Sequence, residues 1–272
     1  MAASCGDANW GSSTSAGDGI ATRGDGAYRL PMGAGEPAEL QVIATGVYEH
    51  VLRDLAAPFA ARNGQGVSFI ITNAGGVIAM LDANAAADVV MTSSAGIDSL
   101  AAKGRVVGAT RADVGGMRLG VAVKSGTPVP DIKTSDTLRE ALRAAPAVAS
   151  IDPHGGGTSG PFIDKLFERL GVAHEVRAKG ILCATGADVV RAVASGRASL
   201  GMTQAAELIG LPGLAFAGFL PDDLQLVTVY SAAITATAKS PAAAAAFIAF
   251  VTGPDGAARL RSSGWDAAPP PR

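Results

Sequence analysis

The sequence predicts an α/β fold of two lobes, each a mostly parallel sheet flanked by helices, with a ligand cleft between the lobes. Apolar strand-like runs alternate with helix-like segments along most of the 272 residues. Several of these runs end in Thr or Ser directly before a helix begins. Two extended segments, around 115–123 and 224–234, are long enough to cross between lobes. These crossings predict lobe one at 38–115 plus 235–265 and lobe two at 118–228.

Composition allows a large core and excludes several functional classes. Apolar residues make up 48% of the chain, and 22 basic residues against 24 acidic ones give a net charge of −2. The chain therefore has no excess of basic residues of the kind that nucleic-acid-binding proteins carry. Cys5 and Cys183 form no CxxC or Cys/His cluster, so we expect neither a metal site nor a cofactor, and Cys183 fits a small core residue. No apolar run is long enough to span a bilayer.

Residues 1–37 predict a disordered tether, because they lack hydrophobic periodicity and are rich in Gly, Ser, Asp and Ala. Within them, Ala2 to Gly6 resembles the end of a bacterial lipoprotein signal, in which the cysteine, here Cys5, carries the lipid. The charged and apolar regions of such a signal are missing. We expect a periplasmic or otherwise extracytoplasmic protein, lipid-anchored through Cys5 if the signal is genuine. A cytoplasmic anion-sensing module is the alternative. The chain end, 266–272, is also expected to be disordered.

Lobe one begins with three strand–helix units. The predicted strands are 40–44, 66–71 and 87–91, and each precedes a segment with apolar residues at helical spacing. The strands end at Thr45-Gly46, at Thr72-Asn73-Ala74 and at Thr92-Ser93-Ser94. Ligands of open α/β sheets bind beyond the carboxyl ends of the strands. Thr45 and Thr72, with Thr92 as a further candidate, are therefore expected to meet at one crevice.

Lobe two contains the most informative loop, Asp152 to Gly160, between the predicted strand 147–151 and a helix whose first turn holds Pro161. Ser159 or Gly160 can cap this helix, and Gly171 can end it. A glycine-rich turn before a helix offers free backbone N–H groups and the positive end of the helix dipole, which suit an anion. A plain strand-to-helix connection is the alternative.

The remaining elements continue the alternation. Further strands are predicted at 117–123, 198–202 and 224–234, and further helices at 135–142, 187–194, 205–209, 241–251 and 254–260.

Taken in order, several motifs resemble the molybdate-binding-like branch of type II bacterial solute-binding proteins. These motifs are "TNAGG", "ADVVMT", "DPHGGGTSG", "ASLGMTQAAEL" and "VTVYSAAI", and the resemblance covers residues 39–265. It implies the two-lobe type II periplasmic-binding-protein fold, a small anionic ligand in the cleft, export, and service to the membrane subunits of an ABC importer. We expect a monomer.

The resemblance also implies which residues contact the ligand. Members that bind molybdate use hydroxyls at the first two strand ends and backbone N–H groups of the second lobe. Carried over motif by motif, the contacts fall at Thr45, Gly46, Thr72, Asn73, Ala74, Thr158, Ser159, Gly160, Val189 and Gln204. A tyrosine of such members falls at Gln204 here, and Pro161 lacks an N–H close to the expected cradle. These departures weaken the case for a tetrahedral oxyanion and leave room for a small organic acid.

The same cleft motifs also resemble those of aconitate isomerases that share this fold. Such a reaction removes a proton next to a carboxylate and returns one elsewhere, and His154, Asp152 and Glu207 are candidates for that role. The alternatives are a solvent-facing loop position for His154, a turn-fixing role for Asp152 and an exposed helix face for Glu207. Arg118 could pair with a carboxylate or be structural. The chain has no Gly-Lys-Ser/Thr of a P-loop and no Gly-x-Ser-x-Gly elbow, which excludes those two chemistries.

Overall fold

The computed structural model describes residues 3–4, 21–22, 28–30, 39–155 and 157–268. Most of the predicted tether, including Cys5, therefore lies outside the described residues. Its described parts form three short strands, β1 (Ala3–Ser4), β2 (Ala21–Thr22) and β3 (Tyr28–Leu30), where a tether was expected. At the other end, β13 (Trp265–Asp266) includes the first residue of the predicted tail, and residues 269–272 lie outside the described part.

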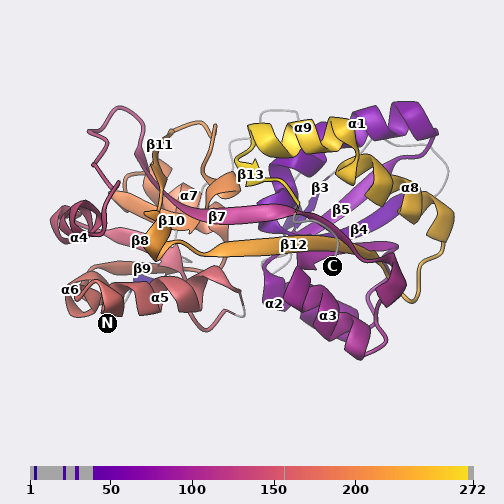
Figure 1. Ribbon diagram of the computed structural model, residues 1–272, viewed down its shortest axis with the longest axis horizontal. Helices are drawn as coiled ribbons and strands as arrows, with labels where there is room; N and C mark the ends of the chain where they lie inside the picture. Colours follow the sequence, from indigo (N-terminus) through magenta and orange to yellow (C-terminus); the bar gives the residue numbers. More distant parts are fainter. Residues whose placement is uncertain (1–2, 5–20, 23–27, 31–38, 156, 269–272) are drawn as a thin grey trace.

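Two long strands organise the molecule. β7 (Ala112–Lys124) pairs with β10 (Leu200–Gln204) through residues 119–123 and with β12 (Val227–Ile234) through residues 112–118. Because β7 changes partner along its length, the described strands form one continuous mixed sheet in the order β1-β9-β8-β10-β7-β12-β6-β4-β5-β3-β2. Two separate, mostly parallel sheets were expected instead. Figure 1 shows two groups of elements at opposite ends of β7 and β12, which run from one group to the other; we call the group on the right the first half and the group on the left the second half.

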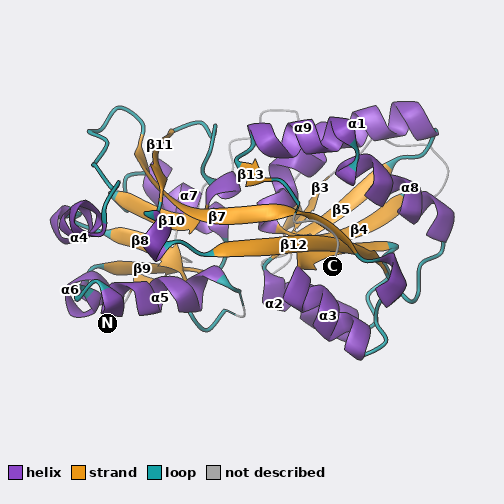
Figure 2. Ribbon diagram, viewed as in Figure 1, coloured by secondary structure: helices purple, strands orange, loops and turns teal. Residues whose placement is uncertain are grey.

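The first half follows the predicted strand–helix alternation. Its parallel strands are β4 (Leu40–Thr45), β5 (Val67–Thr72) and β6 (Val89–Ser93). The helices are η1 (Gly46–Tyr48), α1 (Glu49–Asn63), α2 (Ala74–Asp82), α3 (Ser94–Ala102), η2 (Gly108–Thr110), α8 (Pro241–Thr252) and α9 (Pro254–Ser262). Alternate strand residues pack on α1, α8 and α9 on one face and on α2 and α3 on the other, so helices cover both faces (Figure 2).

The second half repeats this layering. Its parallel strands are β8 (Val148–Ile151), β9 (Gly180–Cys183) and β10, and β11 (Leu214–Phe219) pairs antiparallel with β7. Its helices are α4 (Ser135–Ala144), α5 (Ser159–Arg169), α6 (Ala173–Ala178), α7 (Gly186–Ala194), η3 (Ala205–Glu207) and η4 (Asp222–Leu224). One face of the sheet packs on α4, α5 and α6, and the other packs on α7. Cys183 is buried among the residues that pack between the sheet and α7, which confirms the prediction that it is a core residue.

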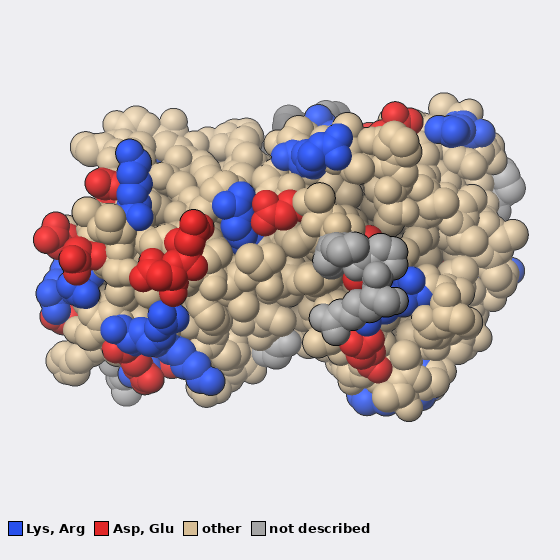
Figure 3. All heavy atoms as spheres, viewed as in Figure 1, with Lys and Arg blue, Asp and Glu red and all other residues tan. Residues whose placement is uncertain are grey.

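The surface carries both signs of charge. On the face shown in Figure 3, Lys and Arg lie beside Asp and Glu. Ion pairs of the described residues include Arg177 with Asp164 at 2.8 Å. No helix in the described ranges is both long enough and apolar enough to cross a membrane.

Candidate functional site

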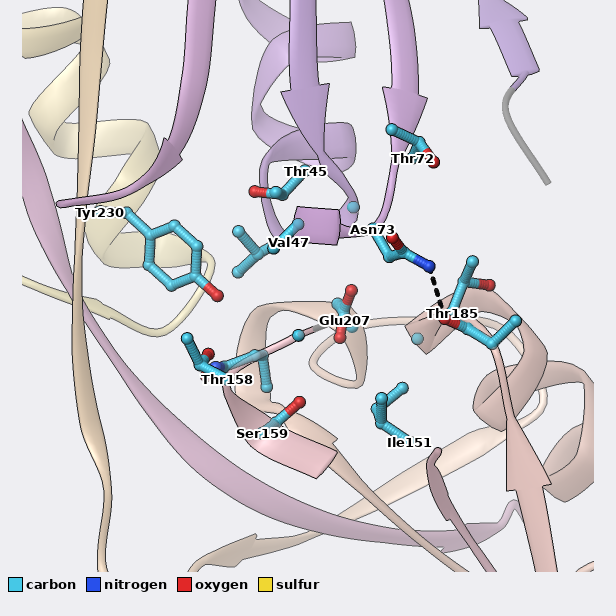
Figure 4. Close-up of a pocket in the computed structure, with 16 residues that line it drawn as sticks. Thr45, Val47, Thr72, Asn73, Ile151, Thr158, Ser159, Thr185, Glu207 and Tyr230 are labelled. Atoms are coloured by element: carbon cyan, nitrogen blue, oxygen red, sulfur yellow. Dashed lines mark hydrogen bonds between the residues drawn. The ribbon is translucent and has the colours of Figure 1, made fainter. Parts of the chain in front are cut away.

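A polar cavity lies between the two halves, where strands of both halves end and helices begin (Figure 4). Its volume is about 50 Å³. Eight residues proposed as ligand contacts line it: Thr45, Gly46, Thr72, Asn73, Ala74, Thr158, Ser159 and Gln204. The structure therefore brings the predicted crevice of the first half and the predicted loop of the second half together.

Thr45 reaches the cavity from the end of β4. β4 and β5 are parallel neighbours, and Thr45 lies directly opposite Thr72, so both strand ends open onto the same place. Thr45 is only 4% exposed, and its hydroxyl oxygen has no hydrogen-bond partner among the described residues. Buried polar groups are almost always hydrogen-bonded, so an unpartnered hydroxyl beside a cavity is a ready contact for a bound ligand.

Asn73 connects the two halves. Its side-chain oxygen accepts a hydrogen bond from the Gly76 N–H at 2.7 Å and so caps α2. Its side-chain nitrogen donates to the Ala184 carbonyl in the second half at 3.3 Å (Figure 4). One side chain therefore both starts a helix and bridges the cavity.

The second half contributes two helix starts. Thr158 and Ser159 lie at the start of α5, and Thr158 makes no side-chain cap bond with that helix. α7 starts at Gly186 behind a capping box, in which the Thr185 hydroxyl accepts from the Asp188 N–H at 3.2 Å and the Asp188 carboxylate accepts from the Thr185 N–H at 3.0 Å. The first N–H groups of a helix have no partner within the helix, which makes these positions suited to an anion.

Gln204, at the end of β10, and Tyr230, in β12, line another part of the cavity. Gln204 is 3% exposed, and its amide makes no hydrogen bond of normal distance and angle, although the amide lies close enough to the Tyr230 phenol to interact with it. Tyr230 enters from β12, and burial, followed by the nearby Glu207 charge, raises the pKa of its phenol well above the ordinary value. The phenol therefore stays protonated and can donate a hydrogen bond.

Glu207 lies between the residues of the two halves in Figure 4. The Thr203 hydroxyl donates to its carboxyl group at 2.7 Å. A Cβ atom on Gly186 would overlap this carboxyl group, and one on Gly46 would lie 2.9 Å from it, so glycines at both positions let it fit. Burial raises the pKa of the Glu207 carboxyl group to about 7, the charge of Glu49 acts in the same direction, and the Thr203 hydrogen bond opposes both. Near neutral pH this group can therefore both accept and return a proton.

The comparison with known proteins agrees with this architecture. The profile of the family described as "Bacterial extracellular solute-binding protein" matches residues 40–266. The chain belongs to this family. An aconitate isomerase of Pseudomonas sp. is 30% identical over 246 residues, which span 88% of this chain and 92% of the relative.

Solved structures show the same fold. The periplasmic molybdate-binding protein of Azotobacter vinelandii superposes with a TM-score of 0.71 at 21% identity, covering 84% of this chain and 98% of that one. L-phospholactate-bound PEB3 superposes with a TM-score of 0.65 at 13% identity, covering 84% of this chain and 99% of that one.

Two of the expected ligand contacts do not line the cavity. A Cβ atom on Gly160 would lie 2.5 Å from the Asp152 carbonyl oxygen, so Gly160 packs on its own loop. Val189 is fully buried in the core beneath α7. Thr92 is also fully buried away from the cavity, so only two of the three strand-end threonines meet there. The N-cap of α5 is Thr158, and the helix begins at Ser159. The predicted cap at Ser159 or Gly160 was therefore one or two residues too late.

Of the three proton-transfer candidates, two lie outside the cavity and one lines it. His154 is exposed and lines a different hollow, beside Pro153 and Arg177. The Asp152 carboxylate accepts from the His154 N–H at 2.9 Å, which fixes the turn. Both were expected near the cleft, and neither lines its cavity. Glu207, in contrast, lies in the cavity and not on an exposed helix face.

Arg118 has structural partners in this solute-binding protein. Its guanidinium lies 3.1 Å from the Asp266 carboxylate and 3.6 Å from the centre of the Phe219 ring. No cluster of His, Cys, Asp or Glu able to hold a metal occurs within the described ranges.

Seven further lining residues were not predicted as contacts, among them Thr185, Gly186 and Tyr230. The helix predicted at 187–194 begins at Gly186 in the structure, and the capping-box spacing of Thr185 and Asp188 would have placed this start to the residue. Tyr230 belongs to "VTVYSAAI", which predicted only a crossing strand. Gln204 stands where molybdate-binding members were expected to have a tyrosine, and in this chain a tyrosine of another strand, Tyr230 of β12, lines the cavity.

Proposed function

We propose that this protein binds a small organic acid anion in the cavity between its halves. The observation that supports this most strongly is the Thr45 hydroxyl, which is buried at the cavity without a hydrogen-bond partner among the described residues. The starts of α2, α5 and α7 converge on the same space. Neutral hydroxyl, amide and N–H donors recognise an anion without a Lys or Arg.

An organic acid fits this lining better than a multiply charged oxyanion does. The Glu207 carboxyl group lies in the cavity wall, and its ionised form would repel a second charge there. A single carboxylate group places less charge beside Glu207 than a dianion does. Tyr230 and Thr158 can both donate to a carboxylate oxygen.

Membership of the family supports a role in solute capture outside the cytoplasm. We propose that the halves are lobes, 38–115 plus 235–265 and 118–228, that close on the ligand. The Asn73 to Ala184 hydrogen bond is a contact that such closure would make. The corresponding physiological role is delivery of the ligand to the membrane subunits of an ABC importer. We expect the protein to act as a monomer in that role.

The second candidate function is isomerisation of an unsaturated polycarboxylate, as named for the Pseudomonas relative. Glu207 favours it, because a general base works best with a pKa near the operating pH. Ionised Glu207 would remove a proton from a CH2 group beside a carboxylate. The electron pair would delocalise over the neighbouring double bond, and protonated Glu207 would return the proton to the far carbon, which moves the double bond.

One experiment tests both functions. Thermal-shift titrations with acetate, succinate, cis-aconitate, sulfate and molybdate should show stabilisation by the carboxylates. The same samples, incubated with cis-aconitate and followed by proton NMR, report turnover. Binding without conversion supports capture, and conversion that Glu207→Gln abolishes supports the isomerase. The absence of stabilisation by every carboxylate would refute the proposed ligand class.

A further inference from the structure

A second chamber adjoins the cavity on the other side of Glu207. The two spaces share five lining residues, Gly46, Thr72, Thr185, Gly186 and Glu207. The inner cavity has a volume of about 50 Å³ and the outer chamber about 290 Å³. Both halves of the molecule line each space, so closure of the halves would enclose them together.

The two volumes suit different parts of one ligand. A water position needs roughly 10–15 Å³ on this scale, so the inner cavity has room for a few such positions, about what one carboxylate group fills. A compound with several acidic groups cannot fit there. The outer chamber approaches the lower end of the range of small-molecule sites, about 300 Å³.

The lining of the outer chamber also differs from that of the cavity. Its walls include the aliphatic side chains of Ile71, Val190 and Leu211, which suit a carbon skeleton. Two nitrogen-bearing side chains from opposite halves line it, His50 of α1 and Arg191 of α7. Arg191 is paired with Asp188 but keeps 68% of its side chain exposed, so the guanidinium can accept a further partner.

One acidic side chain besides Glu207 lines the outer chamber. Glu49 is ion-paired with Arg53 at 2.9 Å, which offsets its repulsion of an anion.

We infer that the ligand is a polycarboxylate that spans both chambers, with one carboxylate in the inner cavity and a second beside His50 and Arg191. This inference rests on the proposed function and specifies its substrate class. The carbons between the two acidic groups then pass Glu207, which is where the isomerisation considered above would need them. A ligand limited to the inner cavity would never contact His50 or Arg191.

The test compares acids of different length on matched variants. Calorimetric titrations of the full chain with acetate, succinate and tricarballylate should show affinity that rises with the number of carboxylates. Arg191→Gln and His50→Gln should each weaken tricarballylate binding about tenfold and leave acetate binding unchanged, and Arg191→Lys should restore part of the loss. His174→Gln, in a separate hollow, is the matched control and should behave like the wild type.

The outcomes separate this inference from the proposed function. Equal affinity for acetate and tricarballylate, or wild-type tricarballylate affinity in both Gln variants, would overturn the two-chamber inference while leaving carboxylate binding in place. No binding of any carboxylate by the wild type would overturn the proposed function and this inference with it.

Discussion

At the scale of single residues, the site depends on polar atoms that the folded protein leaves without partners. Leaving a buried hydroxyl without a hydrogen bond costs about 1–3 kcal/mol, and a ligand that supplies the partner recovers part of that energy. The Thr45 hydroxyl is in this position, and Glu207 and Gln204 add a carboxyl group and an amide at the same cavity. Such residues lower the free energy of unfolding of the ligand-free protein, and they are retained because they contact the ligand.

Thr45 offers a direct test with an internal control. Thr45→Val removes the unpartnered hydroxyl, so we expect unchanged or slightly higher stability together with about tenfold weaker ligand binding. Thr92→Val is the control, because the Thr92 hydroxyl is equally buried and unpartnered but lies away from the cavity. Urea unfolding and calorimetry measure the two effects. Equal affinity in the two variants would contradict a role for Thr45 in the site.

Glu207 predicts an unusual dependence of stability on pH. Its pKa is raised from 4.5 to about 7 on folding, so the folded chain holds this proton more tightly than the unfolded chain does. The resulting stabilisation is fully present below pH 4.5 and is lost as the pH rises through 7. Glu207→Gln stays neutral throughout, so its free energy of unfolding should exceed that of the wild type at pH 8 by up to about 3 kcal/mol.

The measurement is urea unfolding at pH 5 and pH 8. The exposed Glu140→Gln serves as the control and should show no such difference between the two pH values. A Glu207→Gln variant that is less stable than the wild type at pH 8 would show that the ionised carboxylate is stabilised by its surroundings.

At the scale of elements, the start of α7 determines where Glu207 can lie. Gly186 is the first residue of this helix, and its missing side chain leaves the space that the carboxyl group occupies. The same helix carries Arg191 one and a half turns later, so a single element forms the boundary between the two chambers and one wall of the outer one.

Gly186→Ala should therefore displace Glu207 while leaving the helix intact. We expect at least tenfold weaker ligand binding, or loss of turnover, with little loss of helical circular dichroism. Gly108→Ala is the matched control, since Gly108 also begins a helix and a Cβ there would lie 3.6 Å from its nearest neighbour. Wild-type binding by Gly186→Ala would show that Glu207 is free to move without consequence.

The elements themselves were largely predictable, because hydrophobic periodicity is local information. The three strands of the first half appear within about two residues of their predicted ends, and Gly171 ends α5 with the left-handed φ of 66° that favours glycine. The single sheet was not predictable, because it depends on β7 changing partners between residues 118 and 119. Placement of the site residues was also only partly predictable. The glycine-rich loop directed attention to His154 and Asp152, whereas the ionisable group in the cavity comes from η3.

At the scale of the whole molecule, a side-chain hydrogen bond joins the two halves at the cavity. Asn73 makes this bond while also capping α2. The two roles can be separated, because Ser also caps helices well but is too short to reach the Ala184 carbonyl.

Asn73→Ser should therefore keep α2 but weaken the contact between the halves. We expect a larger radius of gyration in small-angle scattering without ligand, and several-fold weaker binding, because less of the protein occupies the closed, binding-competent state. Asn63→Ser, at the exposed end of α1 and away from the cavity, is the control. An unchanged radius of gyration would show that other contacts hold the halves together.

The aromatic cluster behind the cavity has an optical consequence. Trp265 packs on Tyr48 with ring centres 5.0 Å apart and on Tyr230 with ring centres 5.5 Å apart, and Tyr230 lines the cavity. The only other tryptophan in the sequence is Trp10. In a Trp10→Phe variant, all indole emission would come from a ring in contact with the wall of the ligand site. Ligand binding should then change the intensity or wavelength of that emission, and Tyr230→Phe should alter the response, so the protein would report its own occupancy without any attached dye.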